Sequence, residues 1–179
     1  MAGKILTRWH VAGATMALLV AVTLLAGFSQ AATAQATAHT VELTIVAGKN
    51  ASDGSFDFNG YQRGAMTVTV PVGWRVVVHF TDVGSMPHSV AVLPNGSHQQ
   101  AMPSATPAFS GATTANFSSG LPKGTTETFT FEATKAGTYE FVCGCPGHAA
   151  AGMWDTLIVS STAEGPSVTP TNAATIVSK

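Results

Sequence analysis

The sequence predicts an all-β protein, a β-sandwich built as one domain. Short runs of alternating apolar and polar residues, typical of half-buried strands, recur from residue 39 onward. Glycine, proline, asparagine and aspartate separate these runs, and no amphipathic helical pattern accompanies them. A chain of 179 residues is long enough for one domain with a hydrophobic core and too short for two full ones.

The N-terminal segment, residues 1–36, has the pattern of an export signal. Lys4 and Arg8 precede an uncharged apolar run from Val11 to Phe28, and small residues follow it up to Ala36. This order is typical of a secretory signal peptide. The apolar run is also close to the length that spans a bilayer, so an uncleaved membrane-anchor helix through residues 11–28 is the alternative. Both place the working domain outside the cytoplasm, in the periplasm or on the extracellular face.

Seven segments after residue 38 have the two-residue periodicity of strands. Their apolar positions would gather on one face of each strand, as in the core of a sandwich. The segments are residues 39–47, 65–70, 74–80, 88–93, 126–131, 138–143 and 153–159.

We assign the domain to residues 37–160. Residues 94–122 are rich in Ser, Ala, Thr and Gly and are too many for a hairpin turn, which predicts an insertion loop. Residues 161–179 contain Pro166 and Pro170 among small polar residues, which is the composition of a flexible tail.

Composition and cysteine spacing exclude several classes of protein. Charged residues make up only 9% of the chain, against about 25% in an average soluble protein. The net charge of −1 gives no basis for binding nucleic acid. The two cysteines, Cys143 and Cys145, are separated by one residue, so a disulfide between them would be strained and would join no distant segments. Their thiols therefore need another role.

Both cysteines lie in the segment FVCGCPGHAAAGMW, with His148 and Met153, and GSMPHS upstream offers His88 at the start of a predicted strand. One thiolate, two imidazoles and a weak thioether form the ligand set of a blue-copper electron-transfer site. Sulfur favours Cu(I) and imidazole serves both oxidation states, so this set suits a metal that exchanges electrons. Spacing alone leaves open whether Cys143 or Cys145 is the ligand, since Cys145-x2-His148 is the spacing of plastocyanin.

These residues carry a resemblance to the cupredoxins, most closely to the sulfocyanin and rusticyanin branch. PGHAAAGMW, MPHS and FDFNGY (residues 56–61) are similar to motifs of that branch, with Asp57 where the sulfocyanin signature FNFNG has Asn. The resemblance covers about residues 40–160 and implies a cupredoxin-like Greek-key β-sandwich, one type 1 copper ion and electron transport. The copper ligands that it implies are His88, Cys143, His148 and Met153.

The same resemblance implies roles for residues around these ligands. Ser89 is expected to tie the two ligand segments together by hydrogen bonds, as a serine does in rusticyanin. Asn59 is expected to hydrogen-bond near the site. Pro87 stands where azurin has a glycine whose carbonyl approaches the metal, which favours four ligands over five. Cys145 is kept as an alternative thiol ligand.

The expected function is that of a one-electron carrier, not of an enzyme. By resemblance, a monomer would exchange electrons with respiratory redox proteins such as a membrane terminal oxidase or a cytochrome. The alternative is a periplasmic or extracellular Cu(I) chaperone or copper-storage protein that uses Cys143 and Cys145. A multicopper enzyme is disfavoured because the chain has no His-x-His motif, and a binuclear copper site because it would need cysteines separated by three residues.

Overall fold

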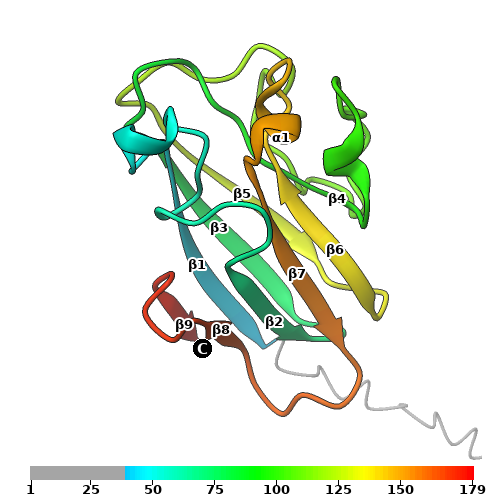
Figure 1. The fold of residues 1–179 in the computed structure, drawn as a ribbon. Coiled ribbons are helices and arrows are strands. Elements are labelled where there is room, and N and C mark those ends of the chain that lie inside the picture. The colour runs from blue at the N-terminus through cyan, green and yellow to red at the C-terminus, as the bar shows by residue number, and fades with distance from the viewer. Residues whose placement is uncertain (1–38) are drawn as a thin grey trace, which may run out of the picture. The chain divides into compact units, whose positions relative to one another are not determined.

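A computed structural model describes residues 39–179 of the chain (Figure 1). The predicted signal peptide or anchor, residues 1–36, lies outside the described residues. Within residues 39–179, no helix combines the length and the apolar character needed to cross a membrane.

Strands account for nearly all of the regular structure in the described residues. They are β1 (Thr40–Ala47), β2 (Thr67–Pro71), β3 (Arg75–Asp82), β4 (Ala91–Pro94), β5 (Thr126–Glu132), β6 (Gly137–Val142), β7 (Trp154–Ser160), β8 (Ser167–Thr169) and β9 (Ile176–Ser178). The helical turns are η1 (Ala51–Asp53), η2 (Ser97–Gln99) and α1 (His148–Ala151).

The strands form two packed sheets, which confirms the predicted β-sandwich (Figure 1). One sheet has the order β5-β3-β1-β9 and the other has the order β4-β6-β7-β2-β8. Successive strands from β1 to β6 alternate between the two sheets, so the chain crosses over the core repeatedly, as in Greek-key folds. These crossovers bring the β3–β4 and β6–β7 loops to the same end of the sandwich.

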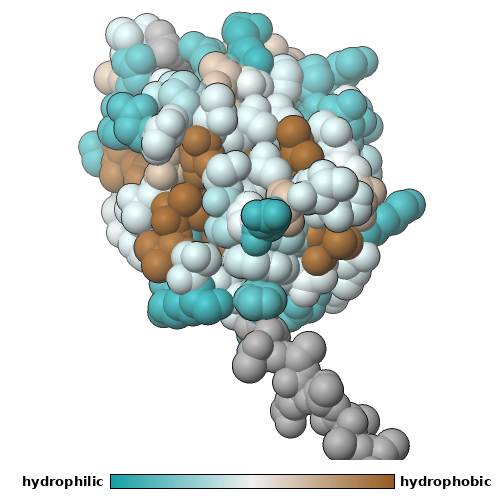
Figure 2. Space-filling view, turned by 90° about the horizontal axis from the view of Figure 1, so that it is seen from below, coloured by the Kyte–Doolittle hydropathy of each residue, from teal (hydrophilic) through white to brown (hydrophobic). Residues whose placement is uncertain are grey.

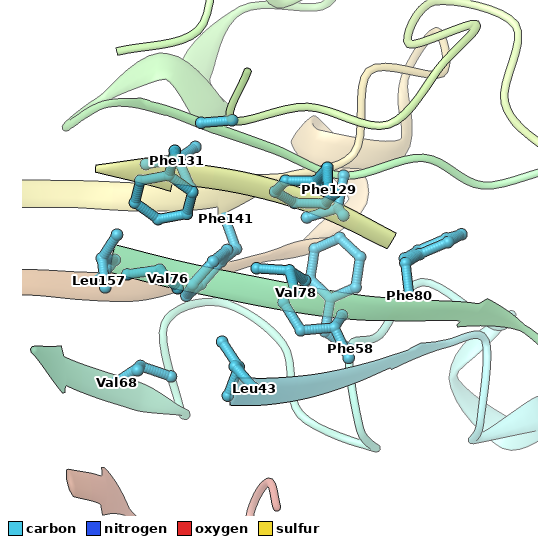
Figure 3. Close-up of a cluster of buried hydrophobic side chains, with 14 of the residues drawn as sticks. Leu43, Phe58, Val68, Val76, Val78, Phe80, Phe129, Phe131, Phe141 and Leu157 are labelled. Carbon is cyan, nitrogen blue, oxygen red and sulfur yellow. The ribbon is translucent and has the colours of Figure 1, made fainter. Parts of the chain in front are cut away.

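The core lies between the two sheets and explains why these segments form strands. In β1, every second residue is buried, and Val41, Leu43 and Ile45 are fully excluded from solvent. Phe129 and Phe131 of β5 pack in the same cluster as apolar residues of the opposite sheet (Figure 3). Two-residue periodicity in the sequence therefore corresponds to the inward face of each sheet.

Residues 161–179, predicted to be a flexible tail, instead form β8 and β9. Strand β8 pairs with β2 and β9 pairs with β1, both antiparallel, so each covers the edge of a sheet. Val168 in β8 and Ala173 between the two strands are buried. The prediction failed because three-residue strands are too short to show periodicity, while their Pro- and Thr-rich surroundings resemble a linker.

The predicted insertion, residues 94–122, contains the short turn η2 and otherwise irregular chain. It is nevertheless packed, because Phe109, Phe117 and Leu121 are buried. Its backbone is also tied to the segment before β4 and to β4 itself, for example from Thr114 N to Val90 O at 2.9 Å. The insertion thus forms one wall of the end where the predicted ligands lie.

The opposite end of the sandwich has a different surface. Seen from that end, hydrophobic areas are small and are separated by neutral and hydrophilic ones (Figure 2). This face therefore offers no broad apolar surface. The predicted ligands lie at the other end of the sandwich, beside α1.

Candidate metal centre

Two loops at the α1 end of the sandwich carry the four predicted ligands (Figure 1). Cys143 follows β6, His148 opens α1 and Met153 precedes β7, while His88 lies between β3 and β4. The backbone closes the first loop, because Cys143 N donates to Met153 O at 3.2 Å and Met153 N donates to His148 O at 3.0 Å. The spacing of the motif therefore corresponds to one compact turn between adjacent strands.

Glycine at the N-terminus of α1 explains why the chain can make this turn. Gly147 has φ of 80°, in the left-handed region, and its position is otherwise open. The His148 backbone N–H then donates to Cys145 O at 3.1 Å. The Pro-Gly-His sequence thus reverses the chain directly after the two cysteines and turns His148 back toward them.

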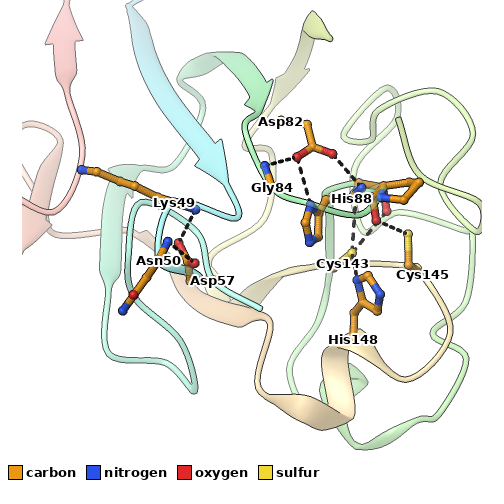
Figure 4. A network of polar contacts seen from close by, with 11 residues as sticks. Lys49, Asn50, Asp57, Asp82, Gly84, His88, Cys143, Cys145 and His148 are labelled. Atoms are coloured by element: carbon orange, nitrogen blue, oxygen red, sulfur yellow. Dashed lines mark hydrogen bonds and ion pairs between the residues drawn. The ribbon is translucent and has the colours of Figure 1, made fainter. Parts of the chain in front are cut away.

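Cys143 and His148 are brought into direct contact. Cys143 Sγ lies 3.5 Å from His148 Nδ1 (Figure 4). The candidate ligand atoms of Cys143, Cys145 and His148 all lie within 4.8 Å of one another. Cys143 is fully buried, whereas His148 is partly exposed and packs against the edge of Phe56, with ring centroids 4.8 Å apart.

His88 lies beside this group, with its ring centroid 5.3 Å from that of His148. It is fully buried, and its Nδ1 is 3.0 Å from Asp82 Oδ1 (Figure 4). A carboxylate accepts the Nδ1 proton and leaves the lone pair on Nε2. That Nε2 atom has no hydrogen-bond partner in the described structure.

A buried polar atom without a partner is costly, so the His88 Nε2 atom calls for an explanation. A metal ion bound to the lone pair would remove the cost, and a carboxylate on the other ring nitrogen is the usual partner of a metal-binding histidine. With a thiol and a second imidazole beside it, this donor set fits copper.

No motif in the sequence singles out Asp82, yet it is the residue that orients His88. Its carboxylate also accepts hydrogen bonds from the backbone of Gly84, at 2.8 Å, and of His88, at 2.9 Å. Asp82 is fully buried at the end of β3. The only signal in the sequence is an acidic residue at the buried end of a strand, shortly before a candidate ligand.

Ser89 joins three segments around Cys143. Its hydroxyl donates to Phe117 O at 2.6 Å and accepts from Gly144 N at 2.9 Å. Its backbone N–H points to Cys143 Sγ at 3.5 Å. A serine at this position therefore links the His88 segment, the insertion and the cysteine loop, and it directs an N–H dipole at the sulfur that would bind the metal.

The other residues that the resemblance singled out are Pro87, Asn59 and Met153, and each makes different contacts. The Pro87 carbonyl accepts a hydrogen bond from the Cys145 thiol at 3.4 Å. Asn59 accepts from Val46 N at 2.7 Å and donates to Thr44 O at 3.1 Å, so it fastens the 56–61 segment to β1 rather than contacting a predicted ligand. Met153 is fully buried in the main core cluster.

The two thiols differ in their protonation. Burial raises the pKa of Cys143 far above its usual range, while the hydrogen bond with Cys143 lowers the pKa of Cys145. A thiol must lose its proton to bind a metal, so metal binding at Cys143 would release a proton. The buried thiol is therefore stable as S–H without metal and becomes a ligand when a cation replaces the proton.

The chain is similar to known proteins of one family. A family model described as the sulfocyanin (SoxE) domain matches residues 29–169. The sulfocyanin of Sulfolobus acidocaldarius is 34% identical over 133 residues, which cover 71% of this chain and 67% of that protein.

Solved structures with a similar fold include a rusticyanin and an auracyanin. A methionine-to-glutamine mutant of rusticyanin matches with a TM-score of 0.51 and 25% identity, over 68% of this chain and 78% of that one. A dithionite-reduced auracyanin from Roseiflexus castenholzii matches with a TM-score of 0.49 and 26% identity, over 66% of this chain and 96% of that one. The family match spans most of the chain and includes both loops that carry the predicted ligands, and this chain therefore belongs to the sulfocyanin family of cupredoxins.

Proposed function

We propose that this protein carries single electrons outside the cytoplasm through one type 1 copper site. The proposed ligands are His88, Cys143, His148 and Met153. The observation that carries the proposal is the buried, unpartnered Nε2 of His88 next to the Cys143–His148 pair. When bound at this donor set, copper supplies one-electron chemistry between Cu(I) and Cu(II).

The protein contributes fixed positions for these donors. Asp82 holds the His88 ring, and Ser89 holds the loop that begins at Cys143. The backbone hydrogen bond from Cys143 N to Met153 O keeps the two ends of the β6–β7 loop together. Because each group is already held by packing and hydrogen bonds, little rearrangement is needed when an electron arrives or leaves.

His148 is the proposed point of electron entry. It is partly exposed, whereas His88, Cys143 and Met153 are fully buried. The residues beside it, from Pro146 to Ala151, carry no charge. A small uncharged surface favours brief docking with little dependence on salt concentration.

The Cu(I) chaperone or storage alternative uses the two thiols and explains less of the site. It gives no role to the buried Nε2 of His88 or to the Asp82 carboxylate behind the ring. The electron-carrier proposal uses both, and we therefore prefer it to the chaperone and to an enzymatic role.

Export and redox partners are further parts of the proposal. The signal-like pattern of residues 1–36 supports a periplasmic or extracellular location, with or without membrane anchoring through residues 11–28. Membership of the sulfocyanin family supports respiratory partners, such as a membrane terminal oxidase or a cytochrome, for a monomeric carrier.

Absorption spectroscopy of the copper-loaded protein tests the proposed function. The Cu(II) form is expected to show an intense visible thiolate-to-copper band that is lost in Cys143→Ser and retained in Cys145→Ser. A colourless protein that holds Cu(I) between both thiols would overturn the carrier proposal in favour of the chaperone.

A further inference from the structure

The two imidazoles of the proposed centre are held in different ways. Asp82 binds the His88 ring from behind, whereas no carboxylate in the described part of the chain forms an ion pair with the His148 ring. The Nδ1 atom of His148 lies 3.5 Å from Cys143 Sγ, but this is a contact between two proposed ligands. The partly exposed His148 ring therefore needs support from outside the ligand set.

Phe56 provides such support. The centroids of the Phe56 and His148 rings lie 4.8 Å apart, and the two ring planes meet at 67°. Aromatic rings favour this edge-to-face geometry, because the positive edge of one ring meets the negative face of the other. Since the attraction depends on the angle between the rings, the contact favours one direction of the imidazole over others.

The β1–β2 loop, residues 48–66, fixes Phe56 through the residue that follows it. The carboxylate of Asp57 is fully buried and accepts hydrogen bonds from three backbone N–H groups. They belong to Lys49 at 3.2 Å, Asn50 at 2.8 Å and Gly60 at 2.7 Å, and Figure 4 shows the first two. One carboxylate thus ties together the chain before and after Phe56.

The backbone conformation also indicates that the position of Phe56 is fixed. Ser55 and Asn59 have φ of 64° and 59°, in the left-handed region that costs energy in residues other than glycine. Such conformations persist only where the surrounding contacts determine them. A Cβ atom at Gly54 would lie 3.1 Å from Phe56 Cε2, so the Phe56 ring packs closely against Gly54 as well as against His148.

We propose that Phe56 is a positioning residue of the metal centre and holds the His148 ring in the direction of Cys143 Sγ. The hydrogen bonds of Asp57 keep the β1–β2 loop rigid for this contact. The inference rests on the proposed function, because His148 is a ligand only in the proposed centre. It gives the segment of residues 56–61 a role that the four-ligand set does not, and it adds a third loop to the centre.

Phe56→Leu and Phe56→Tyr test the inference, because the first removes the ring and the second keeps it. NMR spectroscopy of the metal-free proteins measures nuclear Overhauser contacts between the His148 ring protons and the Cys143 β-protons. We expect these contacts in wild type and Phe56→Tyr and their loss in Phe56→Leu, where the imidazole takes several directions. In chelator competition, Phe56→Leu should bind Cu(II) about tenfold more weakly than wild type, as when an outer partner of a metal ligand is removed. Phe56→Tyr should keep the wild-type affinity.

Tyr139→Leu is the matched control. Tyr139 is also a half-buried aromatic residue that packs against another ring, that of Phe109 at 4.7 Å, and neither residue is a proposed ligand. Its variant should keep both the NMR contacts and the copper affinity. Asp57→Ala tests the loop by a second route, since it retains Phe56 but removes the acceptor of three N–H groups, and it should weaken the NMR contacts.

The outcomes separate this inference from the proposed function. Wild-type contacts and copper affinity in Phe56→Leu would overturn the inference and leave the proposed function in place. Equal losses in Phe56→Leu and Phe56→Tyr, or in Tyr139→Leu, would also overturn it, because the effect would then not depend on the ring beside His148. Wild-type contacts in Asp57→Ala would overturn the role of the Asp57 hydrogen bonds. A wild type without the visible band would overturn the proposed function, while NMR of the metal-free proteins would still decide whether Phe56 holds His148. Far-ultraviolet circular dichroism of the metal-free variants verifies that they fold.

Discussion

Asp82 and His88 form a fully buried carboxylate–imidazole pair, with Asp82 Oδ1 3.0 Å from His88 Nδ1. The carboxylate does two things to the ring. It holds Nδ1 and leaves the buried Nε2 without a partner, and it adds a negative charge behind a proposed ligand. Because negative charge in a buried site favours the more highly charged metal ion, Asp82 should stabilise Cu(II) relative to Cu(I).

Replacing Asp82 by Asn tests this electrostatic role. An amide oxygen in the place of Oδ1 still accepts the hydrogen bond from His88 Nδ1, so the visible absorption band should persist, while the charge and the bond from the His88 backbone N–H are lost. We expect Cu(II) binding to weaken about tenfold, which alone raises the reduction potential by about 59 mV. A redox titration measures the shift.

Glu140→Gln is the matched control for Asp82→Asn. Glu140 is 1% exposed and its Oε1 lies 2.8 Å from Nδ1 of the partly exposed His98. It is therefore a second buried carboxylate beside an imidazole, and neither residue is a proposed ligand. Its variant should leave the potential unchanged. An Asp82→Asn protein with the wild-type potential would show that the carboxylate only positions the ring.

Asp155 is a buried acid whose charge affects stability rather than metal binding. Its Oδ1 accepts from Met66 N at 2.9 Å, while Oδ2 has no partner in the described structure. Burial raises the pKa of Asp155 from 3.8 to about 8. The folded protein therefore holds a proton on Asp155 that the unfolded chain releases above pH 4.

This raised pKa predicts how stability depends on pH. Between about pH 4 and pH 8 the folded state binds one more proton, so the free energy of unfolding should fall by about 1.4 kcal/mol per pH unit as pH rises. Below pH 4 both states are protonated and the contribution of Asp155 is constant.

Asp155→Asn should remove this slope and make the protein more stable than wild type near pH 7. Chemical denaturation of the metal-free protein at pH 4, 6 and 8 measures the effect. Glu164→Gln, at an exposed acid, should retain the wild-type slope. Parallel curves for wild type and Asp155→Asn would contradict the assigned pKa.

The β3–β4 loop positions His88 through close packing as well as through Asp82. A Cβ atom at Gly84 would lie 2.3 Å from His88 Cε1 and 2.7 Å from His88 Nδ1. No real side chain tolerates such distances, so the imidazole ring would have to move. Glycine is therefore required at position 84 because the His88 ring occupies the space of a side chain, and not because of the backbone angles of Gly84.

Gly84→Ala should displace the His88 ring and weaken Cu(II) binding about tenfold or more, with a weaker visible band. Chelator competition and absorption spectroscopy measure both effects. Gly165→Ala is the matched control, since Gly165 also lacks a left-handed φ and has nothing within 4 Å of its Cβ position. Wild-type copper binding in Gly84→Ala would mean that the loop shifts without moving the ring.

At the level of strands, local patterns predicted the structure where the strands are long enough to alternate. Each of the seven predicted segments overlaps one of β1 to β7, because their buried faces follow the two-residue period. Strands β8 and β9 were missed because three residues carry no period. Asp82 was missed for a different reason, since a carboxylate that turns back onto a histidine six residues later leaves no motif.

Among the candidate ligands, too, local sequence spacing predicted some positions and left others undetermined. Cys143, His148 and Met153 share one loop, so their spacing already implied proximity. His88 lies in a different loop, and its position beside them depends on the crossover of strands between the two sheets. Spacing also left Cys143 and Cys145 equivalent, and the structure places both sulfurs near His148.

The C-terminal strands extend the sandwich beyond the residues that carry the centre. Strand β8 covers the free edge of β2, and β9 covers that of β1, where Thr40 and Lys179 exchange backbone hydrogen bonds at 3.1 and 2.8 Å. Unpaired edges invite association between chains. Residues 161–179 should therefore contribute to stability and solubility without affecting the metal centre.

Val168 and Val177 allow this contribution to be measured with a matched pair of substitutions. Val168 of β8 is 7% exposed and lies opposite the buried Val68, whereas Val177 of β9 is 46% exposed. Val168→Ala should lower the free energy of unfolding by about 2 kcal/mol, because it removes two buried methyl groups and leaves a cavity. Val177→Ala should change it by less than about 0.5 kcal/mol. Both variants should keep the wild-type visible band, and equal stability of the two in urea denaturation would mean that β8 is not anchored in the core.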